Sequence, residues 1–167
     1  MIQKKICLLG GFGVGKTSLV SRFVHSMFSD KYLTTIGVKI EKKSVDVHDV
    51  RVELVIWDIY GHDDFQKLRV SYLRGASGYL LVADGTRRET LETAFEVQHL
   101  AEESIGRVPF ILVINKADLR AQWEIDDAAL TALTAAGWRV VQTSAKNGDM
   151  VETVFATLAG RMVEAVS

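Results

Sequence analysis

Apolar residues in this chain gather in six short runs of strand length. The run at 6–9 is continuous, as expected of a strand buried on both faces, whereas the run at 50–56 alternates apolar and polar residues. Because only His48-Asp49 separates this run from the preceding one, we expect a tight turn and one antiparallel pair. The predicted strands are residues 6–9, 38–47, 50–56, 78–84, 110–114 and 140–142.

Apolar residues at helical spacing separate most of these strands. Thr86 and Glu89 have the spacing of a capping box before one of the helices. Strands alternating with helices predict an α/β fold, with a mostly parallel six-stranded sheet, one antiparallel edge pair and helices on both faces. The predicted helices are a stripe from Leu19 to Met27, a short segment at about 65–73, and residues 91–105, 126–136 and 150–163.

Polar residues cluster where the predicted strands end. In a parallel α/β sheet, ligands bind at the carboxyl ends of the strands. The coincidence of four clusters at such ends indicates one binding site assembled from distant segments. The clusters are residues 10–17, 57–63, 115–118 and 143–146.

The first cluster, Gly10 to Thr17, fits the phosphate-loop pattern G-x-x-x-x-G-K-[ST] between a strand and a helix. Glycines let backbone N–H groups point at phosphate oxygens, and the helix N-terminus adds positive charge. Lys16 would reach the β- and γ-phosphates, and the Thr17 hydroxyl would bind Mg²⁺. The alternative is a glycine-rich turn that precedes a helix by chance. The expected nucleotide contacts are Gly11, Phe12, Gly13, Val14, Gly15, Lys16, Thr17 and Ser18.

The second cluster extends this site towards a metal ion. Asp58 follows an apolar strand and can hold Mg²⁺ opposite Thr17, or alternatively it caps the next helix. Gly61 leaves room for a backbone N–H beside the γ-phosphate, which places it with Lys16 at the reacting group.

Asn115, Lys116 and Asp118 form the pattern N-K-x-D just beyond a strand. The Asp118 carboxylate can accept two parallel hydrogen bonds, which matches the N1–H and N2–H₂ donors of guanine, whereas adenine would leave the acceptor unpaired. We expect Lys116 to pack along the base and Asn115 to tie this loop to the phosphate loop. The pocket would be completed by Ser144, by Ala145, whose N–H would donate to the guanine oxygen, and by Lys146.

The composition fits one domain over residues 1–167, with 48% hydrophobic and 25% charged residues. The net charge of −1 gives no basic field for nucleic acid or an anionic membrane. The single cysteine, Cys7, lies in a predicted buried strand and fits a reducing, cytoplasmic setting. We find no signal peptide, membrane span or lipidation motif.

Together these motifs resemble the Ras superfamily of small GTPases, most closely its Rab-like branch, almost end to end. The resemblance implies a P-loop NTPase fold (a small G domain) and a molecular switch that binds GTP or GDP with Mg²⁺ and hydrolyses GTP. It rests on residues 10–17, 28–38, Trp57-Asp58, Gly61, 72–76, 115–118 and 143–146.

The resemblance also assigns roles that the residues alone do not. It implies Thr35 as a second protein ligand of Mg²⁺ and Phe28 packed edge-on against guanine, although Phe28 could equally close the stripe of the first helix. Protein effectors would contact the switch segments, including Trp57 and Tyr72, and an exchange factor and an activating protein are the expected regulators. Trp57 could equally be packing.

The second switch segment departs from the family pattern W-D-T-A-G-Q-E, because residues 57–63 read W-D-I-Y-G-H-D. His62 replaces the glutamine that orients the attacking water; it could hold that water or take no part. Tyr60 replaces a small residue beside the γ-phosphate, and Phe12 would crowd an activating arginine. We therefore expect tight GTP binding and slow hydrolysis.

Two other function classes stay open at this point. One is a module that holds GTP or GDP without hydrolysis, as a scaffold or as part of a larger protein, which Phe12, Tyr60 and His62 favour. The other is a small-molecule kinase, which would leave N-K-x-D unexplained.

Overall fold

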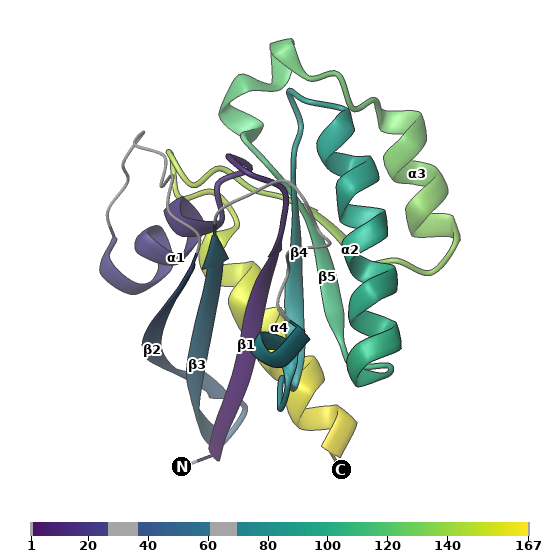
Figure 1. Ribbon diagram of the computed structural model, residues 1–167. Helices are drawn as coiled ribbons and strands as arrows, with labels where there is room; N and C mark the ends of the chain where they lie inside the picture. Colours follow the sequence, from purple (N-terminus) through teal and green to yellow (C-terminus); the bar gives the residue numbers. More distant parts are fainter. Residues whose placement is uncertain (1, 27–36, 61–69, 167) are drawn as a thin grey trace.

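The computed structural model describes residues 2–26, 37–60 and 70–166, and its strands form one sheet in the order β2-β3-β1-β4-β5-β6 (Figure 1). Only β2 and β3 pair antiparallel, while the other neighbouring strands are parallel. The predicted α/β sheet with one antiparallel edge pair is therefore confirmed. The strands are β1 (Ile2–Gly10), β2 (Gly37–Val47), β3 (Val50–Tyr60), β4 (Gly78–Asp84), β5 (Phe110–Asn115) and β6 (Val140–Gln142).

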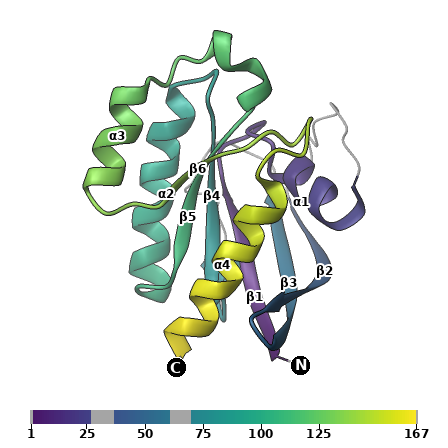
Figure 2. The ribbon, with the colours of Figure 1, turned by 180° about the vertical axis from the view of Figure 1, so that it is seen from behind.

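Helices cover both faces of this sheet. Side chains alternate between the faces, so in β1 Ile6 and Leu8 pack with α1 and α4, whereas Cys7 and Leu9 pack with α2 and α3. Figures 1 and 2, which view the sheet from opposite sides, show α2 and α3 on one face and α1 and α4 on the other. The helices are α1 (Lys16–His25), α2 (Glu89–Ile105), α3 (Asp127–Ala135) and α4 (Val151–Val166), with 3₁₀ turns η2 (Val70–Leu73) and η3 (Ala117–Gln122).

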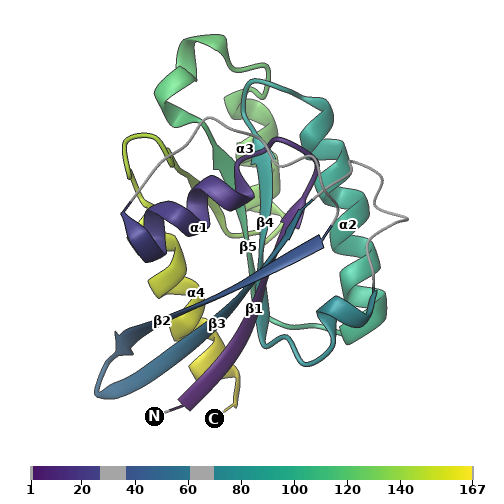
Figure 3. The same cartoon turned by 60° about the vertical axis from the view of Figure 1, so that its left-hand side comes forward.

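The β2–β3 hairpin forms one edge of the sheet (Figure 3). Its turn falls at the predicted position, with His48 at a φ of 53° and Val47 paired with Val50. β3 continues to Tyr60, beyond the end expected at residue 56, because β2 pairs with it along its whole length.

Two predictions about helix ends need correction. The α2 helix begins at Glu89, and the side chain of its N-cap residue, Arg88, makes no capping hydrogen bond. Thr86 is not part of a capping box, because its hydroxyl donates instead to Asp84 Oδ1 at 2.7 Å.

Among the helices that the structure describes, none combines the length and the apolar character that crossing a membrane requires.

Because β1 and β4 lie in close contact at Gly10, adding a single methyl group there should destabilise the protein. Gly10 has a φ of 147°, and a Cβ there would lie 2.3 Å from the backbone oxygen of Val82, its partner in the β1–β4 ladder. We expect Gly10→Ala to lower the free energy of unfolding by about 3 kcal/mol or more, measured by urea denaturation.

The matched control is Gly137→Ala, at a φ of 97° with no atom within 4 Å of the added Cβ. It should cost only about 1 kcal/mol, from backbone strain alone. Equal losses at the two positions would contradict the steric explanation.

Candidate functional site

The glycine loop joins β1 to α1 at the carboxyl edge of the sheet. Gly15 caps the helix in a left-handed conformation, with a φ of 104°. Lys16, only 7% exposed, donates from Nζ to the Gly10 oxygen at 3.0 Å and to the Gly11 oxygen at 2.8 Å. The ammonium group is thus held inside the curve of the loop, beside the N-terminus of α1, where the helix dipole places partial positive charge.

Asn115, at the end of β5, links this loop to the neighbouring ones. Its Nδ2 donates to the Val14 oxygen at 3.0 Å, and its Oδ1 accepts from the Thr143 hydroxyl at 3.1 Å and from the Ala145 N–H at 3.3 Å. A Cβ on Gly15 would lie 2.1 Å from Nδ2, so the glycine lets the two segments approach. The tie that the sequence predicted between Asn115 and the phosphate loop is present.

Asp118 and the 143–146 segment lie on the same side of the site. The Ser144 hydroxyl donates to Asp118 Oδ1 at 2.8 Å, which fixes the carboxylate. From α1, the Arg22 guanidinium donates to the Ala145 oxygen at 2.8 Å and to the Lys146 oxygen. The 143–146 segment is therefore held from both α1 and β5.

Thr17 and Asp58 form the candidate metal site. The Thr17 hydroxyl donates to Asp58 Oδ2 at 2.7 Å, and Asp58 is 1% exposed. Among the described residues, Asp58 Oδ1 is the buried side-chain atom without a hydrogen-bond partner. Burial raises the pKa of Asp58 above its ordinary value, against the Thr17 hydrogen bond and the charge of Lys16. A hydroxyl beside an unpartnered carboxylate oxygen fits the oxygen ligands of Mg²⁺.

Several predicted site residues lie outside the described part of the chain: Phe28, Thr35, Gly61 and His62. Trp57 is described and half-buried, with Lys5 Nζ 3.6 Å from its ring centroid and the Tyr72 ring 6.2 Å away. It therefore takes part in packing while keeping exposed area.

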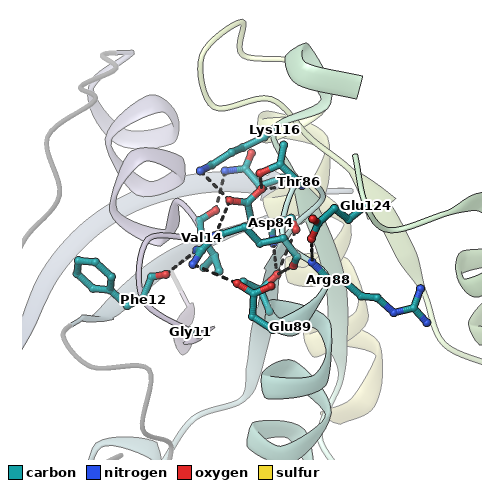
Figure 4. Close-up of polar contacts among 12 residues, drawn as sticks. Gly11, Phe12, Val14, Asp84, Thr86, Arg88, Glu89, Lys116 and Glu124 are labelled. Atoms are coloured by element: carbon teal, nitrogen blue, oxygen red, sulfur yellow. Dashed lines mark hydrogen bonds and ion pairs between the residues drawn. The ribbon is translucent and has the colours of Figure 1, made fainter. Parts of the chain in front are cut away.

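A fifth polar cluster, which the sequence reasoning missed, follows β4 (Figure 4). Asp84, fully buried, accepts hydrogen bonds from Thr86 and pairs with Lys116 at 2.8 Å and with Arg87 at 3.2 Å. Burial alone would raise the pKa of Asp84, but the hydrogen bonds from Lys116 and Thr86 outweigh burial and lower it. An acidic residue ending a buried strand at the ligand-binding edge was the signal that could have found it.

The fold and these loops together define a P-loop nucleotide-binding G domain. Residues 5–164 match the Ras family. The Ras-related protein SEC4 of Saccharomyces cerevisiae is 34% identical over 163 residues, 97% of this chain and 76% of SEC4. Rab-13 of Canis lupus familiaris is 33% identical over 157 residues, 93% of this chain and 77% of Rab-13, and Rab-13 of Bos taurus is 32% identical over the same length.

The chain belongs to the Ras family and is similar to its Rab-type members. As in that family, it is a GTP-binding molecular switch and a GTPase. Slow hydrolysis is typical of the family. Ras-family GTPases bind GTP or GDP together with Mg²⁺ and act through protein effectors and regulators. The match favours the switch over the small-molecule kinase.

The hydrogen bonds of Asn115 predict a large effect of its removal. Asn115→Ala leaves the Val14 oxygen, the Thr143 hydroxyl and the Ala145 N–H without this partner. We expect the free energy of unfolding to fall by about 3 kcal/mol, measured by urea denaturation, because buried polar groups lose their hydrogen bonds.

Asn147→Ala, a change to an exposed asparagine of the neighbouring loop, is the control. It should stay within about 0.5 kcal/mol of the wild type. Comparable losses for both variants would show that Asn115 does not hold the loops together.

Proposed function

We propose that this switch binds its guanine nucleotide along the carboxyl edge of the sheet, with residues 11–18 around the phosphates and Asp118 at the base. Ser144, Ala145 and Lys146 complete the base pocket, and Thr17 and Asp58 hold Mg²⁺. The observation that carries the proposal is the convergence of these side chains from four separate strand ends.

At the phosphates, charge and backbone geometry support the proposal. Lys16 is a buried cation at the N-terminus of α1, which is an electropositive end. A buried ammonium at the positive end of a helix favours a multiply charged anion, and Lys16 can exchange its loop carbonyls for phosphate oxygens. Lys16 would thereby neutralise charge on the group that is transferred.

At the metal, Thr17 and Asp58 would supply the oxygen ligands, and bound Mg²⁺ would neutralise phosphate charge. Ionised Asp58 has one oxygen paired with Thr17 and one buried without a partner. A divalent cation near Oδ1 would satisfy that oxygen. Thr35 is proposed as a further ligand on the family resemblance alone, as are Phe28 at the base and Gly61 and His62 at the γ-phosphate.

At the base, specificity rests on Asp118. Ser144 fixes one carboxylate oxygen, so the group is oriented before a base arrives. A guanine would donate twice to this carboxylate, while an adenine cannot. Asn115 and Arg22 hold the loops around it in place.

For two groups proposed at the base, the structure shows a contact that was not expected from the sequence. Lys116, expected along the base, forms an ion pair with Asp84 at 2.8 Å. The Ala145 N–H, expected at the guanine oxygen, donates to Asn115 Oδ1 at 3.3 Å, a long bond that leaves room for a stronger acceptor. We therefore propose that Lys116 fixes the loop through its ammonium group in addition to packing along the base.

Substitution at the base tests the proposed function directly. Asp118→Asn should weaken GDP binding by roughly a hundredfold or more and favour xanthine nucleotides, whose ring carries a carbonyl in place of the amino donor. Competition against a fluorescent GDP analogue measures both effects. An unchanged affinity for GTP would rule out Asp118 as the base-reading residue.

The metal site predicts a dependence on Mg²⁺ and on pH. Burial raises the pKa of Asp58 in the folded state, so without Mg²⁺ ionisation of this carboxyl destabilises the protein. The free energy of unfolding therefore falls as the pH rises from the ordinary pKa of the unfolded chain through the raised pKa of the folded protein. A cation bound to the ionised carboxylate offsets that cost. We expect Mg²⁺ to slow GDP release by about tenfold or more in the wild type and by about threefold or less in Asp58→Asn.

The surface variant Asp46→Asn, whose carboxylate pairs with Arg51 on the hairpin, is the control and should keep the full Mg²⁺ effect. Equal Mg²⁺ effects in Asp58→Asn and the wild type would exclude Asp58 from the metal site.

A slow rate of hydrolysis in this chain is also proposed, from Phe12, Tyr60 and His62. The surface of Trp57 and Tyr72 is proposed for effectors, because these two half-buried rings lie together. The cytoplasmic setting and the single domain over 1–167 stay predictions from the sequence.

A further inference from the structure

Arg87, in the segment between β4 and α2, contacts the phosphate loop. Its Nη2 donates to the Phe12 oxygen at 2.7 Å, and its Nε donates to Asp84 Oδ2 at 3.2 Å. Arg87 is therefore held between the outer part of the loop and a buried carboxylate. The Phe12 ring points away from this contact, which involves its backbone alone (Figure 4).

Asp84 holds Arg87 in a fixed position for this contact. Its Oδ1 accepts from the N–H of Thr86 at 2.9 Å and from the Thr86 hydroxyl at 2.7 Å, which shapes the turn that carries Arg87. Its Oδ2 faces two cations, Arg87 and Lys116. A fully buried carboxylate with these partners stays ionised and cannot move without leaving charges unpaired.

Lys116 carries the chain of contacts into the base-reading loop. It lies in N-K-x-D with a φ of 74°, and its carbonyl accepts from Trp123 Nε1 at 2.8 Å. Phe12, Arg87, Asp84 and Lys116 thus form a continuous series from the phosphate loop to the base loop. This series is separate from the bond between Asn115 and Val14.

We propose that Arg87 is a positioning residue for the nucleotide: it fixes the phosphate loop at Phe12 and couples that loop, through Asp84, to Lys116 at the base. The inference rests on the proposed function, because it assumes that the nucleotide lies against both loops. Arginine suits the role since its planar fork holds two acceptors at once, whereas a lysine ammonium is a single point charge. Loss of Arg87 frees the loop and shortens the time for which a nucleotide stays bound.

The experiment measures GDP dissociation, by displacement of a fluorescent GDP analogue, in the Arg87→Gln variant of the 167-residue chain. We expect dissociation to accelerate roughly tenfold, the effect of a lost hydrogen bond to a charged group. Arg88→Gln is the matched control with the same charge change, because the Arg88 guanidinium extends away from the cluster in Figure 4. Its rate should stay within about twofold of the wild type.

Coupling through Asp84 is tested by a double-mutant cycle. In an Asp84→Asn background, Arg87→Gln should have a much smaller effect than in the wild type, because the two residues act through one network. Arg87→Lys, which keeps the charge without the fork, should accelerate release by roughly threefold. It also serves as the test variant if Arg87→Gln does not fold.

Each of the following results would overturn the inference. One is that Arg87→Gln releases GDP at the same rate as Arg88→Gln. Another is that Arg87→Gln accelerates release as much in the Asp84→Asn background as in the wild type. A third is that Arg87→Lys releases GDP at the wild-type rate. A lower Tm of GDP-saturated Arg87→Gln with an unaltered release rate would show a merely structural role, and it overturns the inference too. If wild-type protein binds no GDP, the proposed function fails as well, which separates that outcome from these.

Discussion

The site depends on the bond between Asn115 and the phosphate loop. The carboxamide of one residue donates to Val14, accepts from Thr143 and Ala145, and lies where a side chain on residue 15 would otherwise be. Three loops that leave different strands are therefore held in one arrangement. Because an amide has both donors and acceptors, a single side chain can serve loops that offer a carbonyl on one side and N–H or O–H groups on the other.

Buried charged side chains are concentrated at the carboxyl edge of the sheet. Lys16, Asp58 and Asp84 are buried there, although charged side chains are rarely buried without partners. Lys16 and Asp84 are surrounded by partners, and only Asp58 retains an unpartnered oxygen among the described residues. The fold thus accepts a desolvation cost at one atom, which is where a cation would be most favourable.

The apolar layers on the two faces of the sheet make this arrangement of polar loops possible. Each central strand contributes side chains to both layers, so the sheet is rigid and its strand ends are fixed relative to one another. The polar residues follow directly from those ends, with short connections. Contacts of a few ångströms between residues as distant in sequence as Phe12 and Arg87 depend on that rigidity.

The sequence by itself determined the sheet, the faces of its helices and the glycine, aspartate and N-K-x-D segments, because period and motif are local properties of the chain. It could not determine how Thr86 or Lys116 is used, since each has several feasible partners within reach. Tertiary structure decided that both serve Asp84, and that Arg87 reaches Phe12. The physical reason is that the partner of a buried charge is set by which groups the packed sheet brings within hydrogen-bonding distance, and no local pattern records that.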